Sequence, residues 1–221
     1  MRNTLTLLTL LAVVGMFCLP SISSAVGLGI YIPTVGSGTS TVKINDEDYE
    51  IDGVDNSHFG FGFVLDTKVA NPGVFNYRLH IGYESFDLGN KGMVDLEDNF
   101  SRFSIDNTFG FAVLQSSVVR LWLGPQIRIS YMGYSDDYND INMIGFGFAP
   151  VLGANFNMGR VFTLAPELGY RFSIFAGTNS YSYEDFYGSY SEDTDFTVNG
   201  SEFYIKLNII FRISDYYDNF F

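Results

Sequence analysis

The sequence has 221 residues, with 25 acidic against 12 basic side chains, a formal net charge of −13, and 17% aromatic residues. So acidic a chain is a poor partner for nucleic acid. Its richness in Phe, Tyr and Gly excludes a disordered protein and favours aromatic strands joined by turns.

The first 25 residues have the layout of a secretory signal peptide. An apolar run from Leu5 to Leu19 is followed by small residues up to Ala25. The run is shorter than the roughly 20 residues of a membrane-spanning helix, so we expect cleavage after Ala25 rather than an anchor. The one cysteine, Cys18, would leave with this segment, and the mature chain would then have no disulfide and no cysteine nucleophile.

Eight later segments alternate apolar and polar residues. Phe75 and Tyr77, for example, alternate with Asn76 and Arg78, which places the two kinds of side chain on opposite faces of a strand. Each segment reaches the roughly 9–11 residues that a tilted strand needs to cross a bilayer. The predicted strands are 26–36, 58–69, 75–86, 100–115, 118–134, 143–157, 161–175 and 201–213.

The connections between these strands alternate in length. Short connections lie at 70–73, 116–117 and 157–160. The long connections are 37–57, 90–99, 135–142 and 176–200. Short turns at one end and long loops at the other are typical of an outer-membrane barrel, and an even number of strands returns both ends to the same side.

The polar face shows which side of the strands meets lipid. It consists mostly of Gly, Ala, Ser and Thr around a few long charged side chains, as a narrow interior requires. The alternative is a soluble lipocalin-like barrel with its apolar face inward, but about half of the Phe residues would then crowd a small cavity. We therefore predict an all-β, eight-stranded, antiparallel up-and-down transmembrane β-barrel over 26–213, with a short tail over 214–221.

With this alternation and these turns, residues 26–221 resemble the small outer-membrane β-barrels of Gram-negative bacteria, of the OmpA/OmpX type. The resemblance implies a place in the bacterial outer membrane, contact with its lipids and lipopolysaccharide, and insertion by the barrel assembly machinery. Such barrels commonly end in an aromatic residue that looks like an assembly signal. Phe221 is the candidate here, although Asp215 and Asn219 interrupt the apolar stripe that leads to it.

Charged residues on the inward face predict a network in the lumen. Folding the fourth and fifth strands about Ser117 places Asp106 opposite Arg128. Buried ions need partners, so the charges either form a salt-bridge plug that fills the lumen or line a narrow, gated ion path. The candidate network is Arg78, Glu84, Arg102, Asp106, Arg120, Arg128, Glu167, Arg171, Lys206 and Arg212.

Most acidic residues lie in the long connections, together with many aromatic ones. The segment 40–51 is predicted to be a hairpin extension of the barrel. Exposed aromatic residues either contact a surface ligand or host protein, or pack at the barrel mouth and the membrane interface. The candidates are Tyr49, Tyr181, Tyr183, Phe186, Tyr187 and Tyr190.

The sequence predicts neither a metal site nor a cofactor. Residues 48–53 resemble part of a calcium loop, but Phe59 stands where a helix–loop–helix site has Glu. Solvated, mutually repelling loops explain this acidity, and loose divalent bridging to lipopolysaccharide stays open.

We also expect no enzymatic activity. The two histidines, His58 and His80, both lack the His-x-Ser pattern of outer-membrane lipid deacylases. His80 falls in the middle of the barrel, which leaves His58, near the rim, as the one candidate base.

The sequence therefore favours a non-enzymatic barrel with a filled lumen, which serves envelope integrity or surface adhesion through its acidic, aromatic loops. The main alternative is a narrow porin-like conduit that prefers cations. A lipid-modifying enzyme is a weaker third interpretation.

Overall fold

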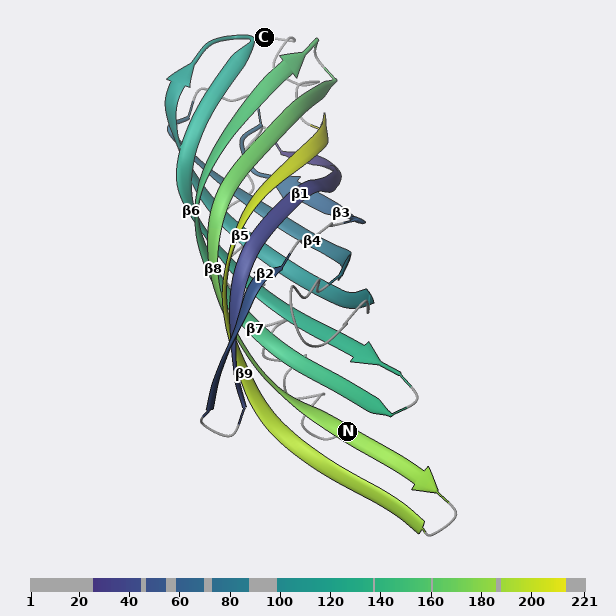
Figure 1. Ribbon diagram of the computed structural model, residues 1–221. Coiled ribbons are helices and arrows are strands. Elements are labelled where there is room, and N and C mark those ends of the chain that lie inside the picture. Colours follow the sequence, from purple (N-terminus) through teal and green to yellow (C-terminus); the bar gives the residue numbers. More distant parts are fainter. Residues whose placement is uncertain are drawn as a thin grey trace.

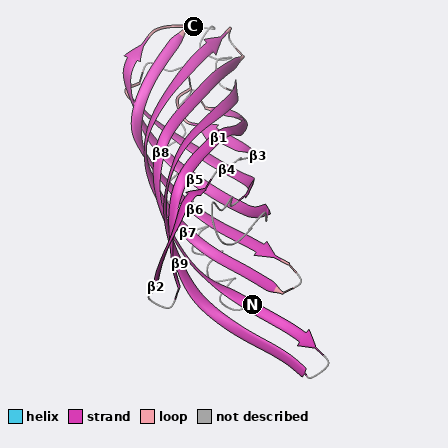
Figure 2. Ribbon diagram, in the orientation of Figure 1, coloured by secondary structure: helices cyan, strands magenta, loops and turns pink. Residues whose placement is uncertain are grey.

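The computed structural model describes residues 26–44, 47–54, 59–69, 73–87, 99–136, 138–159, 161–185 and 188–213. The predicted signal segment, the tail with Phe221, and His58 lie outside these residues. None of the described residues forms a helix long and apolar enough to cross a membrane. Strands joined by turns make up the described chain (Figure 2).

The strands wind around a common axis (Figure 1), and neighbours in the sheet pair antiparallel. They are β1 (Gly27–Ile44), β2 (Glu47–Val54), β3 (Phe59–Asp66), β4 (Phe75–Asp87), β5 (Asn99–Gln115), β6 (Val119–Ser135), β7 (Asn139–Met158), β8 (Phe162–Asp185) and β9 (Gly188–Arg212).

A ring of eight strands closes because β1 pairs on both of its edges. One edge pairs with β9 from Gly27 to Ile44. The other edge pairs with β3 up to Tyr31 and with β2 from Gly38 onward. The ring therefore consists of β1 and β3 to β9, while β2 completes a hairpin that extends from it. The predicted eight-stranded antiparallel barrel is confirmed.

The two ends of the ring differ. At the short-turn end, β3–β4, β5–β6 and β7–β8 are connected, and the start of β1 pairs with the end of β9. At the hairpin end, β8 and β9 reach farthest from the ring (Figure 1). The predicted hairpin over 40–51 is confirmed, because Ser40 pairs with Ile51 and Ile44 with Glu47.

Two predicted long loops are wrong. The connection over 135–142 is a tight turn, since β6 and β7 pair as far as Ser135 and Asp140. The connection over 176–200 is a paired hairpin, since β8 and β9 pair as far as Asp185 and Gly188. Both segments extend beyond the apolar surface, where water wets the two faces and alternation disappears while the backbone ladder continues. The predicted loop over 90–99 lies mostly outside the described residues.

The apolar face of the barrel points outward. Phe61, Phe63 and Phe172 are 62%, 70% and 55% exposed. The opposite parity is buried: Arg78 and Asp106, both 0% exposed, are examples. A water-soluble protein has the reverse arrangement, so the predicted inversion is confirmed and the outer surface is suited to acyl chains.

Tyrosine hydroxyls mark where the apolar outer surface gives way to polar residues. The Tyr83 hydroxyl lies 2.5 Å from Ser101 Oγ, and the Tyr170 hydroxyl donates to Ser201 Oγ at 2.9 Å. The Tyr131 hydroxyl donates in the same way to a polar side chain of β7. Such amphipathic rings are typical of a membrane–water interface, so these boundary tyrosines place the interface toward the hairpin end.

The β6–β7 turn is held by one carboxylate. Asp136 Oδ1 accepts the backbone N–H groups of Tyr138 at 2.7 Å and Asn139 at 2.6 Å, and the Asp136 N–H donates to the Asn139 carbonyl at 2.9 Å. The hydrogen bonds from these two backbone N–H groups lower the pKa of Asp136 to about 2.

We expect Asp136→Ala to speed hydrogen exchange at the amides of Tyr138 and Asn139, because both lose their acceptor. The pKa of Asp136 is depressed in the folded state, so its stabilising effect is present above the unfolded pKa of about 3.9. That effect is lost as the pH falls through about 2. The difference between variant and parent should therefore be present at neutral pH and vanish near the lower value. An Asp193→Ala variant is the control, and equal exchange in parent and Asp136→Ala at neutral pH contradicts the assignment.

Candidate functional site

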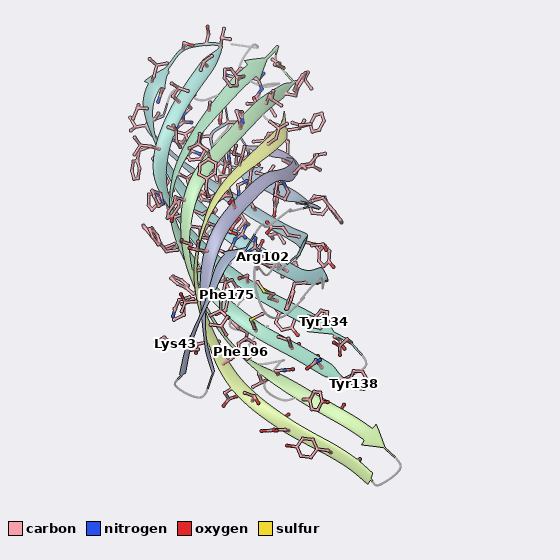
Figure 3. The ribbon with its side chains drawn as sticks, in the orientation of Figure 1. Lys43, Arg102, Tyr134, Tyr138, Phe175 and Phe196 are labelled. Atoms are coloured by element: carbon pink, nitrogen blue, oxygen red, sulfur yellow. The ribbon has the colours of Figure 1, made fainter. Side chains whose placement is uncertain are left out.

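The lumen holds most of the charged side chains of the barrel. Figure 3 shows Arg102 within the ring, and it shows that Phe175 and Phe196 lie closer to the hairpin end than Arg102 does. Among the described residues, each strand of the ring except β7 has at least one inward, buried side chain that is ionised or aromatic. Strand β7 contributes small residues there, such as Gly147 and Ala149.

Asp106 is the centre of the charge network. Its carboxylate accepts Arg128 Nε at 2.5 Å and Arg128 Nη2 at 2.8 Å. Lys206 Nζ reaches the same carboxylate from β9, across the lumen, and Arg171 Nη2 lies 4.0 Å from it. The predicted pairing of Asp106 with Arg128 is confirmed by the register and by these contacts.

A second group of ions lies on the hairpin side of Asp106. Glu84 accepts Arg102 Nε at 2.8 Å and Arg128 Nη2 at 3.2 Å. Glu202 pairs with Arg171, and it lies 3.5 Å from Arg102 Nη1. Each carboxylate thus meets at least two guanidinium groups, so every ion of this group has an opposite charge beside it.

A third group lies toward the short-turn end. Arg78 donates to Asp66 Oδ2 through Nε at 2.8 Å, pairs with Glu167, and donates to Asn155 Oδ1 at 2.9 Å. His80 belongs here: its Nε2 lies 2.8 Å from the oxygen of an Asn208 amide that itself donates to Glu167 at 3.0 Å. The histidine is fully buried.

Buried aromatic rings make cation–π contacts with the cations of the lumen. The Arg171 guanidinium lies 4.2 Å from the Tyr204 ring centroid, and Lys206 Nζ lies 5.1 Å from that of Tyr31. Arg78 lies 5.1 Å from the Trp122 ring centroid. These cation–π contacts add attraction where water is excluded.

Glycines make room for the large rings. A Cβ at Gly153 would lie 2.1 Å from Trp122, and one at Gly82 would lie 2.1 Å from the Tyr31 hydroxyl. Any other residue at these two positions would displace an aromatic ring, which explains why the polar parity is rich in glycine.

Apolar layers close the lumen on both sides of the charges. Toward the hairpin end, a lid is formed by Phe100, Met132, Met143 and Phe175. Tyr134, Ile141, Phe196 and Val198 pack against this lid. Toward the short-turn end, a floor is formed by Val64, Val69, Ala165 and Ile210. The lumen is therefore packed with side chains from floor to lid.

Eight of the ten predicted network residues meet in this cluster, and two lie elsewhere. Arg120 donates to the backbone carbonyls of Lys68 at 2.6 Å and Gly73 at 2.9 Å. Arg212 donates to the backbone carbonyl of Phe162 at 3.4 Å. These two arginines bind backbone carbonyls at the short-turn end, because Arg120 lies at the start of β6 and Arg212 at the end of β9.

Sequence reasoning missed the neutral residues that complete the cluster. Gln126 Oε1 accepts both the Tyr204 hydroxyl at 2.9 Å and Arg171 Nη2 at 2.8 Å. Tyr31 and Trp122 also point inward. Gln126, Tyr204, Tyr31 and Trp122 all lie on the inward face of their strands, so the alternation alone could have identified them.

The loop candidates fall on the hairpin end. Tyr181 and Tyr190 are 39% and 55% exposed. The backbones of Tyr49 and Tyr183 lie in β2 and β8, whereas Phe186 and Tyr187 lie outside the described residues. Within the described part of the chain, no group of three or more His, Cys, Asp or Glu is placed to hold a metal ion.

Comparison with solved structures decides the fold family. No family model and no curated protein matches the sequence. The barrel superposes on the crystal structure of the outer membrane protein OprG from Pseudomonas aeruginosa with a TM-score of 0.58 and 9% identity, over 86% of this chain and 94% of OprG. The outer membrane protein AlkL, solved in DMPC bilayers, gives a TM-score of 0.51 and 8% identity, over 89% of this chain and 95% of AlkL. The chain has the fold of a bacterial outer-membrane β-barrel.

More distant superpositions bear on neither activity nor substrate. The outer membrane protease OmpT from Escherichia coli gives a TM-score of 0.42 and 9% identity, over 89% of this chain and 99% of OmpT. That similarity is too low to carry catalysis over to this outer-membrane barrel.

We expect Asp106→Ala to destabilise the barrel by about 3–5 kcal/mol, because Arg128 and Lys206 lose a buried counter-charge. The measurement is the temperature at which the folded band is lost in unboiled detergent gels, supported by urea unfolding in lipid vesicles. Asp193→Ala, which removes an exposed carboxylate on the β8–β9 hairpin, is the matched control. Equal transition temperatures for the Asp106→Ala variant and the parent contradict the role of Asp106.

Proposed function

We propose that this barrel is a non-enzymatic protein of the outer membrane that supports the envelope and makes surface contacts through its hairpins. The filled lumen is the observation that carries the proposal. Buried side chains occupy the interior of the ring between floor and lid, which suits a scaffold better than a channel.

The alternative of a narrow conduit meets an obstacle in the lid and the ion cluster. A solute on the barrel axis would have to part the lid and then separate Arg128 from Glu84 and Asp106. Breaking buried ion pairs costs several kcal/mol each, so passage along the axis is disfavoured.

The β8–β9 hairpin supports a role in surface contact. Beyond the pairing of Tyr181 with β7 and of Phe196 with β1, its two strands pair only with each other among the described residues. Residues 176–200 contain acidic residues and no Lys or Arg. Glu192, Asp193 and Tyr190 are exposed there. A protruding acidic ribbon with tyrosines favours contact with a basic surface.

The histidine within the described residues does not favour catalysis on a membrane lipid. His80 is buried beneath the rings and bonded to Asn208, out of reach of a lipid on the outer surface. His58, the candidate base of the sequence, lies outside the described residues, so its role stays a prediction.

Planar bilayers containing the purified protein test the filled lumen. We expect no unitary current steps in 1 M KCl, because an ion would have to part the lid and the ion cluster formed by the described residues. A larger barrel of known conductance, inserted under the same conditions, is the control. Steady unit steps from this protein would favour the conduit.

A shortened hairpin separates the two parts of the proposal. Residues 183–190 are replaced by an Asn-Gly turn, which keeps the pairing of Tyr181 with Glu192. We expect cells producing this variant to exclude a hydrophobic dye as the parent does, but to be retained less on a lysine-rich protein surface. A full-length variant with Tyr183→Ser and Tyr190→Ser, two tyrosines that the shortened variant lacks, shows how much of the loss belongs to the aromatic rings. Unchanged retention of the shortened variant contradicts the contact role.

A further inference from the structure

A groove interrupts the outer surface near the hairpin end, on strands β4 to β7. Its volume is about 540 Å³, within the range of roughly 300–1,000 Å³ that small-molecule sites have. Three outward aromatic side chains line it: Tyr83, Phe103 and Tyr131, which are 43%, 47% and 49% exposed and are direct neighbours across β4, β5 and β6. We call this hollow the boundary groove.

The groove continues past these rings because of Gly133. Its cross-strand neighbours are Ser101 on β5 and Asn142 on β7, and all three residues line the groove one step closer to the hairpin end than the rings. A Cβ at Gly133 would meet no atom closer than 3.7 Å, so the barrel wall could accept a larger residue there. The absent side chain therefore leaves space on the outer surface without serving the packing of the lumen.

Two tyrosines direct their hydroxyl groups to the two neighbours of Gly133. The Tyr83 hydroxyl lies 2.5 Å from Ser101 Oγ, and the Tyr131 hydroxyl donates to Asn142 Oδ1. Each ring therefore spans the step from the apolar row to the polar row. Aromatic faces and fixed hydroxyl groups thus line the same hollow.

The rim of the groove adds an amide and a carboxylate. Asn142 Nδ2 donates to Asp140 Oδ1 at 2.9 Å, and Asp140 is exposed and pairs in register with Ser135, another groove residue. A sugar ring is complementary to this set of groups. Its hydroxyl groups donate to a carboxylate and both donate to and accept from amide and hydroxyl groups, while its C–H face packs on an aromatic ring.

The position of the groove decides which sugar is near it. Outer-membrane barrels have short turns toward the periplasm and longer loops toward the cell surface, so the hairpin end faces outward. The boundary tyrosines place the groove at the membrane interface of that side. The lipid of the outer leaflet is lipopolysaccharide, in which an acylated glucosamine disaccharide lies at this depth.

We propose that the boundary groove binds the sugar headgroup of one lipopolysaccharide molecule. One glucosamine ring occupies the space at Gly133 and hydrogen-bonds to Asp140 and Asn142, and an acyl chain lies on Phe103. The phosphate groups of the lipid point away from Asp140 and take no part in the contact. This inference goes beyond the proposed contact role of the hairpins, because the groove lies on the barrel wall.

Native mass spectrometry of the whole barrel in an uncharged detergent tests the proposal with three lipids. They are a tetra-acylated glucosamine disaccharide with two phosphates, the same disaccharide without phosphates, and cardiolipin, which has four acyl chains and two phosphates but no sugar. We expect one molecule of either disaccharide per barrel to be retained at several-fold lower lipid concentration than cardiolipin. Equal retention of cardiolipin means that the sugar is not recognised. Loss of retention when the phosphates are removed means that the phosphates hold the lipid, and either result overturns the proposal.

Three variants locate the site. Gly133→Leu fills the hollow and should abolish the preference for both disaccharides. Asp140→Asn keeps the shape but loses the charge, and should weaken their binding by about threefold, because hydrogen bonds to an ionised acceptor are the stronger ones. Ala176→Leu adds the same bulk to the outer surface in the register row of Tyr131, two strands away, and should bind as the parent does.

The folded band of each variant in unboiled gels shows that the barrel is intact. If Gly133→Leu is folded and still prefers the disaccharides, the lipid lies elsewhere and the proposal fails. If Asp140→Asn binds them as tightly as the parent does, the carboxylate does not hold the sugar, and the proposed recognition fails with it.

Discussion

The barrel depends on neutralising ionised side chains inside a ring too narrow for bulk water. Asp106 shows this best, because the side chains that neutralise it come from β6 and β9 while it stands on β5. Each of these ions would cost several kcal/mol if it were buried alone. One carboxylate therefore ties together strands that lie on different sides of the ring, and the charge balance holds only when the ring is closed.

Space is the second constraint, and it follows from the first. Long cationic side chains and the rings of Tyr31, Trp122 and Tyr204 fill a cavity that eight strands can barely provide. Glycines such as Gly153 supply the room for them on facing strands. The outer surface meets no such limit, since acyl chains adapt to any apolar side chain, and Phe, Leu and Ile dominate there.

The boundary tyrosines divide the protein into a membrane part and a part that water surrounds. On the short-turn side of these tyrosines, each strand has one apolar face toward the membrane. On the hairpin side, the strands are held together by backbone hydrogen bonds alone, so β8 and β9 continue as a polar ribbon. A packed ring that carries such a ribbon fits the proposed scaffold and contact roles.

The sequence by itself determined the two faces of each strand, the strand order and the pairing of Asp106 with Arg128, because alternation and turn length are local properties. It did not reveal that Lys206 reaches Asp106 across the lumen, although Glu167 is its neighbour in the ladder. It also mistook 176–200 for a loop, since a ribbon wetted on both faces has no alternation to detect. Only ring closure decides which inward side chains meet, because contacts across a cavity depend on the stagger of all eight strands.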